Sequence, residues 1–158
     1  MKSKRDHPGV YIPPPLIYVA VFLIALILQF RLPLSESLFH YAGTKIVGVI
    51  VMLVAIVFFL FRSLRQFFRS NNTVVTMLPA HSLQTTGIYS VTRNPMYVGL
   101  SLLYLGIACI IGNWWNFFLF PLLLLIVQEY VIKREEKYLV RRFGEAYLDY
   151  RRKVRRWI

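Results

Sequence analysis

The stretch from Asn94 to Gln128 contains no Asp, Glu, Lys, Arg or His, and this restricts the fold more than any other feature. As one helix rising about 1.5 Å per residue it would be roughly 50 Å long, although a hydrocarbon core about 30 Å thick needs only about 20 residues. The stretch must therefore fold back on itself. Gly112-Asn113 is a suitable turn, and Trp114 and Trp115 after it suit a membrane interface. We expect a helical hairpin over residues 95–132.

Two earlier apolar runs are long enough to cross a bilayer. Residues 10–30 lack the same five residue types, and the run ending at Phe61 is long enough when it begins at residue 43. The 158 residues are 57% hydrophobic and 16% charged, which is too apolar for a soluble domain of this size. The predicted fold class is therefore all-α: one membrane-embedded domain, residues 1–158, with about four transmembrane helices and a helical tail.

The net charge of +12 does not indicate a nucleic-acid-binding domain, because the basic residues flank hydrophobic segments. Anionic lipid headgroups are the simpler partner. By the positive-inside rule, the basic residues place both termini, and with them the polar segments that could form an active site, in the cytoplasm. The basic residues on the predicted cytoplasmic side are Lys2, Lys4 and Arg5 before the first span, Arg62, Arg65, Arg69 and Arg93 between the second and third, and ten more after the fourth. The loops on the opposite side contain Arg31 and Lys45.

The tail from Lys133 to Ile158 combines many charges with an apolar series of helical spacing. The pattern predicts an amphipathic helix, and because Gly144 interrupts it, two short helices are the alternative. A basic amphipathic helix lying on anionic lipid is one interpretation of this tail. The series comprises Leu139, Phe143, Tyr147, Tyr150 and Val154, with spacings of four, four, three and four.

The segment beginning at Arg93 contains a plausible helix start. Pro95 suits the first helical turn, and Asn94 is then a plausible N-cap. The N–H groups of that turn, together with Arg93, would make a site for an anionic group such as an amino-acid carboxylate. Gly99 would let a ligand or a neighbouring helix approach the backbone closely. An ordinary helix start with a snorkelling arginine is the alternative.

The adjacent pair Glu135-Glu136 follows the fourth span, in a chain with only seven acidic residues. Carboxylates at a membrane boundary are costly unless something uses them. They can accept hydrogen bonds from ribose hydroxyls or an ammonium group, and they favour a sulfonium charge. Alternatively, Glu136 pairs with Lys133 one helical turn back. The sequence shows no metal-type cluster, dinucleotide fingerprint or phosphate loop, so we expect no metal site and no soluble Rossmann-type enzyme.

Three motifs flank the expected hairpin in a fixed order and span about residues 73–158. In these motifs the chain resembles the isoprenylcysteine carboxyl methyltransferase and phospholipid methyltransferase group of integral membrane enzymes. The motifs are His81-x-Leu83-x-Thr85-x-Gly87-Ile88-Tyr89, then Arg93-x-Pro95-x-Tyr97-x-Gly99, and finally Glu135-Glu136-x-x-Leu139 followed by Phe143-Gly144-x-x-Tyr147-x-x-Tyr150 and Val154.

The resemblance implies an enzyme that transfers a methyl group from S-adenosylmethionine, bound at the cytoplasmic membrane edge, to a hydrophobic small-molecule or lipidated acceptor. Arg93 would orient a carboxylate acceptor, whereas an amine acceptor would need Glu135 or Glu136 as a base. The catalytic candidates are thus Arg93, Glu135 and Glu136. The expected cofactor-binding residues are His81, Gly87, Tyr89, Arg93, Asn94, Pro95, Tyr97, Gly99, Glu135 and Glu136.

Two positions depart from the family pattern. Many members carry histidine where this chain has Asn94, and a proline commonly stands at the position of Arg155. Two other functions remain open: an NADPH-dependent membrane reductase of the sterol reductase type, which shares a related hairpin, and a non-catalytic lipid-binding or scaffold protein. The adjacent glutamates and the Phe143-Gly144 spacing favour the methyltransferase.

Overall fold

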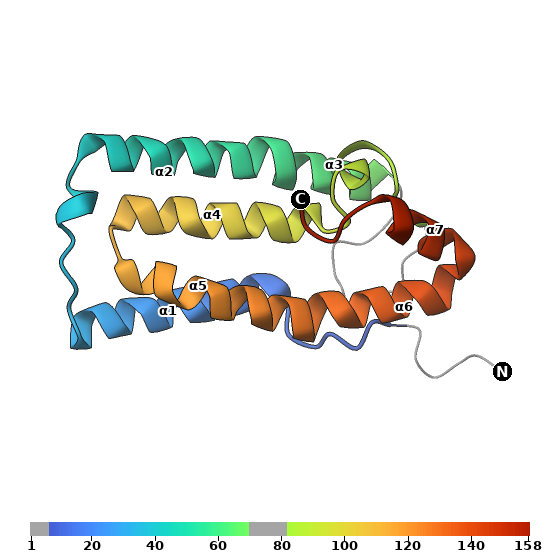
Figure 1. Ribbon diagram of the computed structural model, residues 1–158, viewed down its shortest axis with the longest axis horizontal. Helices are drawn as coiled ribbons and strands as arrows, with labels where there is room; N and C mark the ends of the chain where they lie inside the picture. Colours follow the sequence, from blue (N-terminus) through green and yellow to red (C-terminus); the bar gives the residue numbers. More distant parts are fainter. Residues whose placement is uncertain (1–6, 70–81) are drawn as a thin grey trace.

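Residues 7–69 and 82–158 are described by a computed structural model in which every regular element is helical (Figure 1). Two π-helical segments, η2 and η4, continue the helices before them without a break, and η1 and η3 are short 3-10 helices. In chain order the elements are α1 (Pro14–Arg31), η1 (Ser37–Phe39), α2 (Ala42–Val54), η2 (Ala55–Phe61), α3 (Arg62–Arg69), η3 (Gly87–Ser90), α4 (Pro95–Ile111), α5 (Trp114–Ile126), η4 (Val127–Ile132), α6 (Lys133–Phe143) and α7 (Glu145–Lys153).

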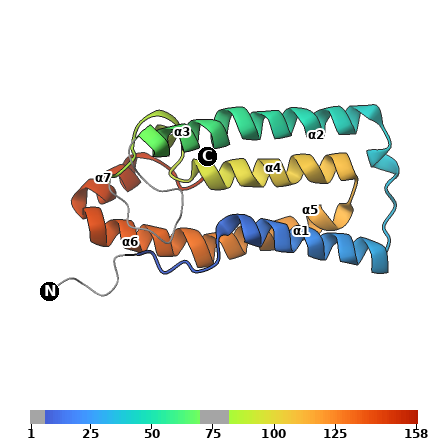
Figure 2. The ribbon, with the colours of Figure 1, turned by 180° about the vertical axis from the view of Figure 1, so that it is seen from behind.

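The long helices lie side by side along one axis. Helix α4 packs between α2 and α5, and α1 packs against α5 (Figures 1 and 2). Within the described residues, three helices are long and apolar enough to cross a membrane: Pro14–Arg31, Ala42–Gln66 and Trp114–Phe143. Helix α4 is a shorter apolar helix of 17 residues, near the lower limit for a span. The predicted all-α, polytopic fold class is confirmed.

The first span begins later than the apolar run predicts. The run starts at residue 10, but α1 starts at Pro14, because consecutive prolines suit a first helical turn and not a helix interior. The last span ends later, since the helix of α5 passes through η4 into α6 without a break.

The predicted turn between the hairpin helices is confirmed at Gly112 and Asn113. Gly112 has φ of 79°, in the left-handed region, and a Cβ there would lie 2.7 Å from the Cβ of Phe39. The Asn113 side chain accepts a hydrogen bond of 2.9 Å from the Trp115 N–H and so caps α5. The Trp115 indole N–H donates to the Leu32 carbonyl at 2.9 Å, which ties this end of the hairpin to the end of α1.

Helices α2 and α4 cross at two glycines. A Cβ on Gly48 would lie 2.8 Å from the Gly106 carbonyl oxygen, and a Cβ on Gly106 would lie 2.8 Å from the Gly48 carbonyl oxygen. Small residues let two membrane helices approach this closely. The crossing fixes the distance between α2 and α4, the first helix of the hairpin.

The tail forms two helices with the break at Gly144, which is the alternative to one continuous helix. Its apolar face packs inside the protein: Tyr147 and Tyr150 are buried against Tyr89, and Leu83 packs against the same cluster. The interpretation of this face as a lipid-bound surface is therefore wrong. The packing folds the tail back over the start of α4, beside which the end of the chain also lies (Figures 1 and 2).

Candidate active site

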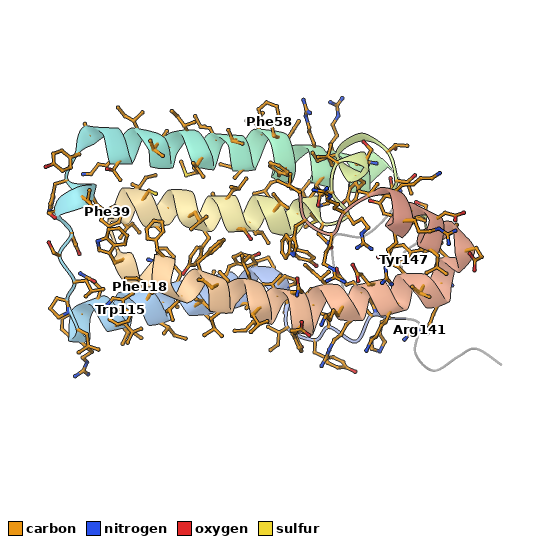
Figure 3. The ribbon with its side chains drawn as sticks, in the orientation of Figure 1. Phe39, Phe58, Trp115, Phe118, Arg141 and Tyr147 are labelled. Atoms are coloured by element: carbon orange, nitrogen blue, oxygen red, sulfur yellow. The ribbon has the colours of Figure 1, made fainter. Side chains whose placement is uncertain are left out.

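Polar side chains from three segments meet at one end of the helical bundle. The segments are the start of α4, the first turn of α6 and residues 155–157, which follow α7. Figure 3 shows Tyr147 at this end, and Phe39 and Trp115 at the opposite end with the hairpin turn. The sequence motifs that lie far apart in the chain therefore do converge.

The centre of the site is a buried ion cluster around Glu136. Arg93 Nη2 lies 3.2 Å from Glu136 Oε1, and the two side chains are only 8% and 9% exposed. Arg156 donates through Nε to Oε1 at 2.9 Å and through Nη2 to Oε2 at 2.7 Å. Arg93 Nη1 also donates to the Tyr147 hydroxyl at 3.3 Å. Two guanidinium groups thus hold one buried carboxylate.

The alternative pairing of Glu136 with Lys133 is wrong. Lys133 instead pairs with Glu129, with its Nζ 2.6 Å from Oε1, and both side chains are largely exposed. The two carboxylates therefore have different environments: that of Glu129 faces solvent, and that of Glu136 faces the interior.

Glu135 occupies a separate position beside the cluster. The Tyr97 hydroxyl donates a hydrogen bond of 2.7 Å to Glu135 Oε1. Helix α1 supports this contact, because the Tyr18 hydroxyl donates to the Tyr97 carbonyl at 3.2 Å and lies 3.0 Å from Ser101 Oγ. Within the described residues, Glu135 Oε2 has no hydrogen bond.

Three buried tyrosines pack together beside the site: Tyr89 from η3, and Tyr147 and Tyr150 from α7. The Tyr150 hydroxyl donates to the Tyr89 carbonyl at 2.6 Å, and the Tyr89 hydroxyl lies 2.8 Å from Ser63 Oγ. Burial raises the pKa of Tyr147 to about 12, and the nearby Glu136 charge adds to the shift. Burial also raises the pKa of Tyr89 and Tyr150, so all three hydroxyls are neutral at pH 7.

The start of α4 differs in detail from the sequence prediction. Pro95 is in the first turn and Asn94 is at the N-cap position, as predicted, but the Asn94 side chain makes no capping bond. Its Nδ2 donates instead to the Arg156 carbonyl at 2.9 Å. The Arg93 guanidinium pairs with Glu136. The predicted anion site, formed by Arg93 and the helix start alone, is therefore not present in this form.

Three predicted cofactor-binding residues remain: Gly99, Gly87 and His81. Gly99 lies against the second helix, where a Cβ would be 2.8 Å from Leu60 Cδ2, so its close neighbour is a helix. Gly87 has φ of 62°, and a Cβ there would be 2.9 Å from Gln66 Oε1. His81 lies outside the described residues. Within residues 7–69 and 82–158, no group of three or more His, Cys, Asp or Glu is placed to hold a metal ion.

Sequence reasoning missed two residues of the site. Arg156 stands among many basic residues, and nothing in its spacing separates it from its exposed neighbours. Tyr18 lies in the first span, where a tyrosine resembles an interfacial aromatic residue. Both reach the site only through tertiary contacts.

Comparisons with known proteins agree with the motifs that carry the site. The family model for phospholipid methyltransferases matches residues 43–146, which is more than half of the chain. The match includes the second helix, the hairpin, and the segments that contribute Arg93 and Glu136. The chain therefore belongs to the phospholipid methyltransferase family. Its helices also make it an integral membrane protein.

Two of the similar proteins are named protein-S-isoprenylcysteine O-methyltransferase. The one from Schizosaccharomyces pombe is 43% identical over 74 residues, and the one from Saccharomyces cerevisiae is 34% identical over 74 residues. Each match covers 47% of this chain but only 31% of the yeast protein. An uncharacterized protein of Haemophilus influenzae is 38% identical over 66 residues, which are 40% of this chain and 100% of that protein. No solved structure matches the chain significantly.

Proposed function

We propose that this protein transfers the methyl group of S-adenosylmethionine to a lipid-like acceptor at the cytoplasmic face of the membrane. The observation that carries the proposal is the convergence of Arg93, Tyr97, Glu135 and Glu136 at one end of the bundle, because these residues come from separate motifs of the family. The names of the yeast relatives support methyl transfer to a lipid-modified acceptor.

The chemistry of the site fits the proposed cofactor. Arg93 Nε is buried and has no hydrogen-bond partner among the described residues, so it suits an acceptor atom such as a carboxylate oxygen of the cofactor. Glu135 Oε2 suits a ribose hydroxyl or an ammonium group. The neutral tyrosines Tyr89, Tyr147 and Tyr150 would exclude water from this side of the site. When bound, S-adenosylmethionine supplies an electrophilic methyl group on a positively charged sulfur.

Methyl transfer by in-line displacement depends mainly on alignment and a dry, preorganised site. In this site Glu136 would hold Arg93 in place, and Tyr97 would orient Glu135. If the acceptor is an amine, a base must take its proton. Glu135 is the better candidate for this base, because both oxygens of Glu136 already accept hydrogen bonds from Arg156.

The contacts that Arg93 already makes favour an amine over a carboxylate as the methyl acceptor. Arg93 already pairs with Glu136 and donates to Tyr147, and its Nε is the proposed donor to the cofactor, so an acceptor carboxylate would have to share this guanidinium with three other groups. In its ionised form, Glu135 attracts an ammonium-type acceptor and repels a carboxylate. A phospholipid-type amine is therefore the preferred acceptor, and a prenylcysteine-type carboxylate is the second.

Calorimetric titration of detergent-purified protein with S-adenosylmethionine tests cofactor binding. We expect saturable binding by the unchanged protein and by Asp149→Asn, whose side chain is exposed on α7, and weakened binding by Arg93→Ala. Binding of NADPH in place of S-adenosylmethionine by the folded protein would instead indicate a reductase. Binding of neither cofactor would leave the lipid-binding or scaffold function.

Turnover of an ethanolamine phospholipid tests the proposed base. Glu135→Gln should slow methyl transfer about 100-fold or more at saturating cofactor, since positioned bases contribute roughly 10²- to 10⁴-fold. Glu129→Gln is the matched control, because it makes the same change at an exposed site in the same helix. Equal rates in these two variants would rule out Glu135 as the base.

Cysteine labelling tests the proposed orientation in the membrane. In a Cys109→Ala background, a cysteine replacing Asp149 should react with a membrane-impermeant maleimide only after the cytoplasmic side is opened. A cysteine replacing the exposed Ser35, at the other end of the bundle, should react in intact cells. The reversed labelling pattern would contradict cytoplasmic termini.

A further inference from the structure

Residues 155–157 pass directly over the segment that begins α4. The Arg93 backbone N–H donates to the Arg155 carbonyl at 3.0 Å. The Arg156 carbonyl accepts two further hydrogen bonds, from Thr92 Oγ1 at 3.1 Å and from Asn94 Nδ2 at 2.9 Å. The backbone of these residues is therefore fixed to the site independently of their side chains.

The Arg156 side chain leaves this backbone and reaches across to α6. Its Nε and Nη2 bind the two oxygens of Glu136 separately, which makes a bidentate fork. A fork of this kind defines the plane of a carboxylate, which a single donor cannot do. Next to it, the Trp157 indole N–H donates to Gln128 Oε1 at 3.1 Å, so the segment is also attached to η4.

The orientation of Glu136 determines where Arg93 lies. Arg93 Nη2 lies 3.2 Å from Oε1 of that carboxylate, and within the described residues Nη1 also donates to the Tyr147 hydroxyl. Rotation of the carboxylate would therefore move the acceptor that holds the Arg93 guanidinium. Because Arg93 Nε is buried and has no partner in the described part of the chain, even a small rotation changes where this donor points.

We propose that Arg156 is a positioning residue: by fixing the Glu136 carboxylate in one plane, it holds Arg93 in the orientation that binds the cofactor. The inference rests on the proposed function, since it gives Arg156 a role in the same site. Arg156 is placed to act through Glu136, and none of its described contacts requires it to touch the cofactor itself.

Titration with S-adenosylmethionine of the full-length protein, with and without the Arg156 side chain, tests this role. Arg156→Ala should raise the dissociation constant about 10- to 100-fold, by analogy with the loss seen when the outer partners of metal ligands are removed. Arg156→Lys keeps the charge but loses the fork, and it should also bind several-fold more weakly. The control is Arg152→Ala, which removes an exposed arginine of α7 and should leave binding unchanged.

A double-mutant cycle separates positioning from a general structural effect. If Arg156 acts through Glu136, the effect of Arg156→Ala on cofactor binding should largely disappear in a Glu136→Gln background. Additive effects of the two changes would overturn the proposal. So would wild-type affinity in a folded Arg156→Lys variant, which decides the matter even if Arg156→Ala does not fold.

The proposed function and the positioning role of Arg156 can be disproved separately. No binding of S-adenosylmethionine by the folded, unchanged protein overturns the proposed function and, with it, this role of Arg156. Tight binding by the unchanged protein together with equally tight binding by Arg156→Ala overturns the positioning role alone.

Discussion

Replacing Glu136 with glutamine should destabilise the protein strongly, because it removes the only negative charge held between Arg93 and Arg156 in the described contacts. Glutamine has nearly the same volume, so packing is preserved and the loss is electrostatic. Breaking a buried ion pair by removing one partner costs about 3–5 kcal/mol, because the remaining charge stays buried and uncompensated.

The exposure of the two arginines sets where in that range the cost falls. The Arg93 side chain is 8% exposed and cannot reach water, whereas the Arg156 side chain is 27% exposed and can be partly solvated. In the variant, the charge of Arg93 thus stays buried, whereas the charge of Arg156 is partly compensated by solvent. We therefore expect a cost near the lower end of the range, about 3 kcal/mol.

Unfolding of the detergent-purified protein by added SDS, followed by circular dichroism, measures this cost. The matched control is Glu129→Gln, which makes the same chemical change in an exposed ion pair and should leave the unfolding midpoint close to that of the unchanged protein. Equal unfolding midpoints for the two variants would refute the reasoning, because burial of the cluster would then make no energetic difference.

Three further changes test other parts of the structure. Gly106→Ala should destabilise the protein by about 1–3 kcal/mol, since the added Cβ would lie 2.8 Å from a backbone carbonyl oxygen, whereas Gly43→Ala, with nothing within 4 Å, should be neutral or slightly stabilising in the same unfolding assay. Ser63→Ala should cost about 1 kcal/mol in that assay through loss of the hydrogen bond with the Tyr89 hydroxyl. Because the pKa of Tyr147 is raised to about 12 in the folded protein from about 10 in the unfolded chain, its contribution to stability should be complete below pH 10 and be lost as pH rises from 10 to 12, which tyrosinate absorbance during alkaline unfolding would follow.

The membrane fold follows from the sequence because its main constraints are local. The length of an uncharged run limits how the chain can cross a bilayer, and Gly112-Asn113 supplies a turn whose backbone and side-chain chemistry are intrinsic to those residues. The break at Gly144 is predictable for the same reason.

The partners within the site do not follow from the sequence, because they depend on tertiary contacts. Helical spacing offers Lys133 to Glu136, but the actual partners are Arg93 and Arg156, which no local pattern connects to it. Asn94 is likewise at its expected N-cap position, yet its side chain binds a carbonyl 62 positions away.

Periodicity has a similar limit in the tail. It identifies the apolar face that contains Tyr147 and Tyr150, but it cannot say whether lipid or protein covers that face. In this protein the residues around Tyr89 cover it. The arginine that completes the site, Arg156, lies beyond the periodic segment altogether.

Transfer of a labelled methyl group from S-adenosylmethionine to an ethanolamine phospholipid, in vesicles containing the purified protein, measures the proposed activity most directly. We predict a lipid-extractable, labelled product that forms with the unchanged protein and with Asp149→Asn, and that is lost with Arg93→Ala. Saturable binding of the cofactor without labelled product from an amine or a carboxylate lipid would contradict lipid methylation. Product formed equally well by Arg93→Ala would contradict the location of the active site.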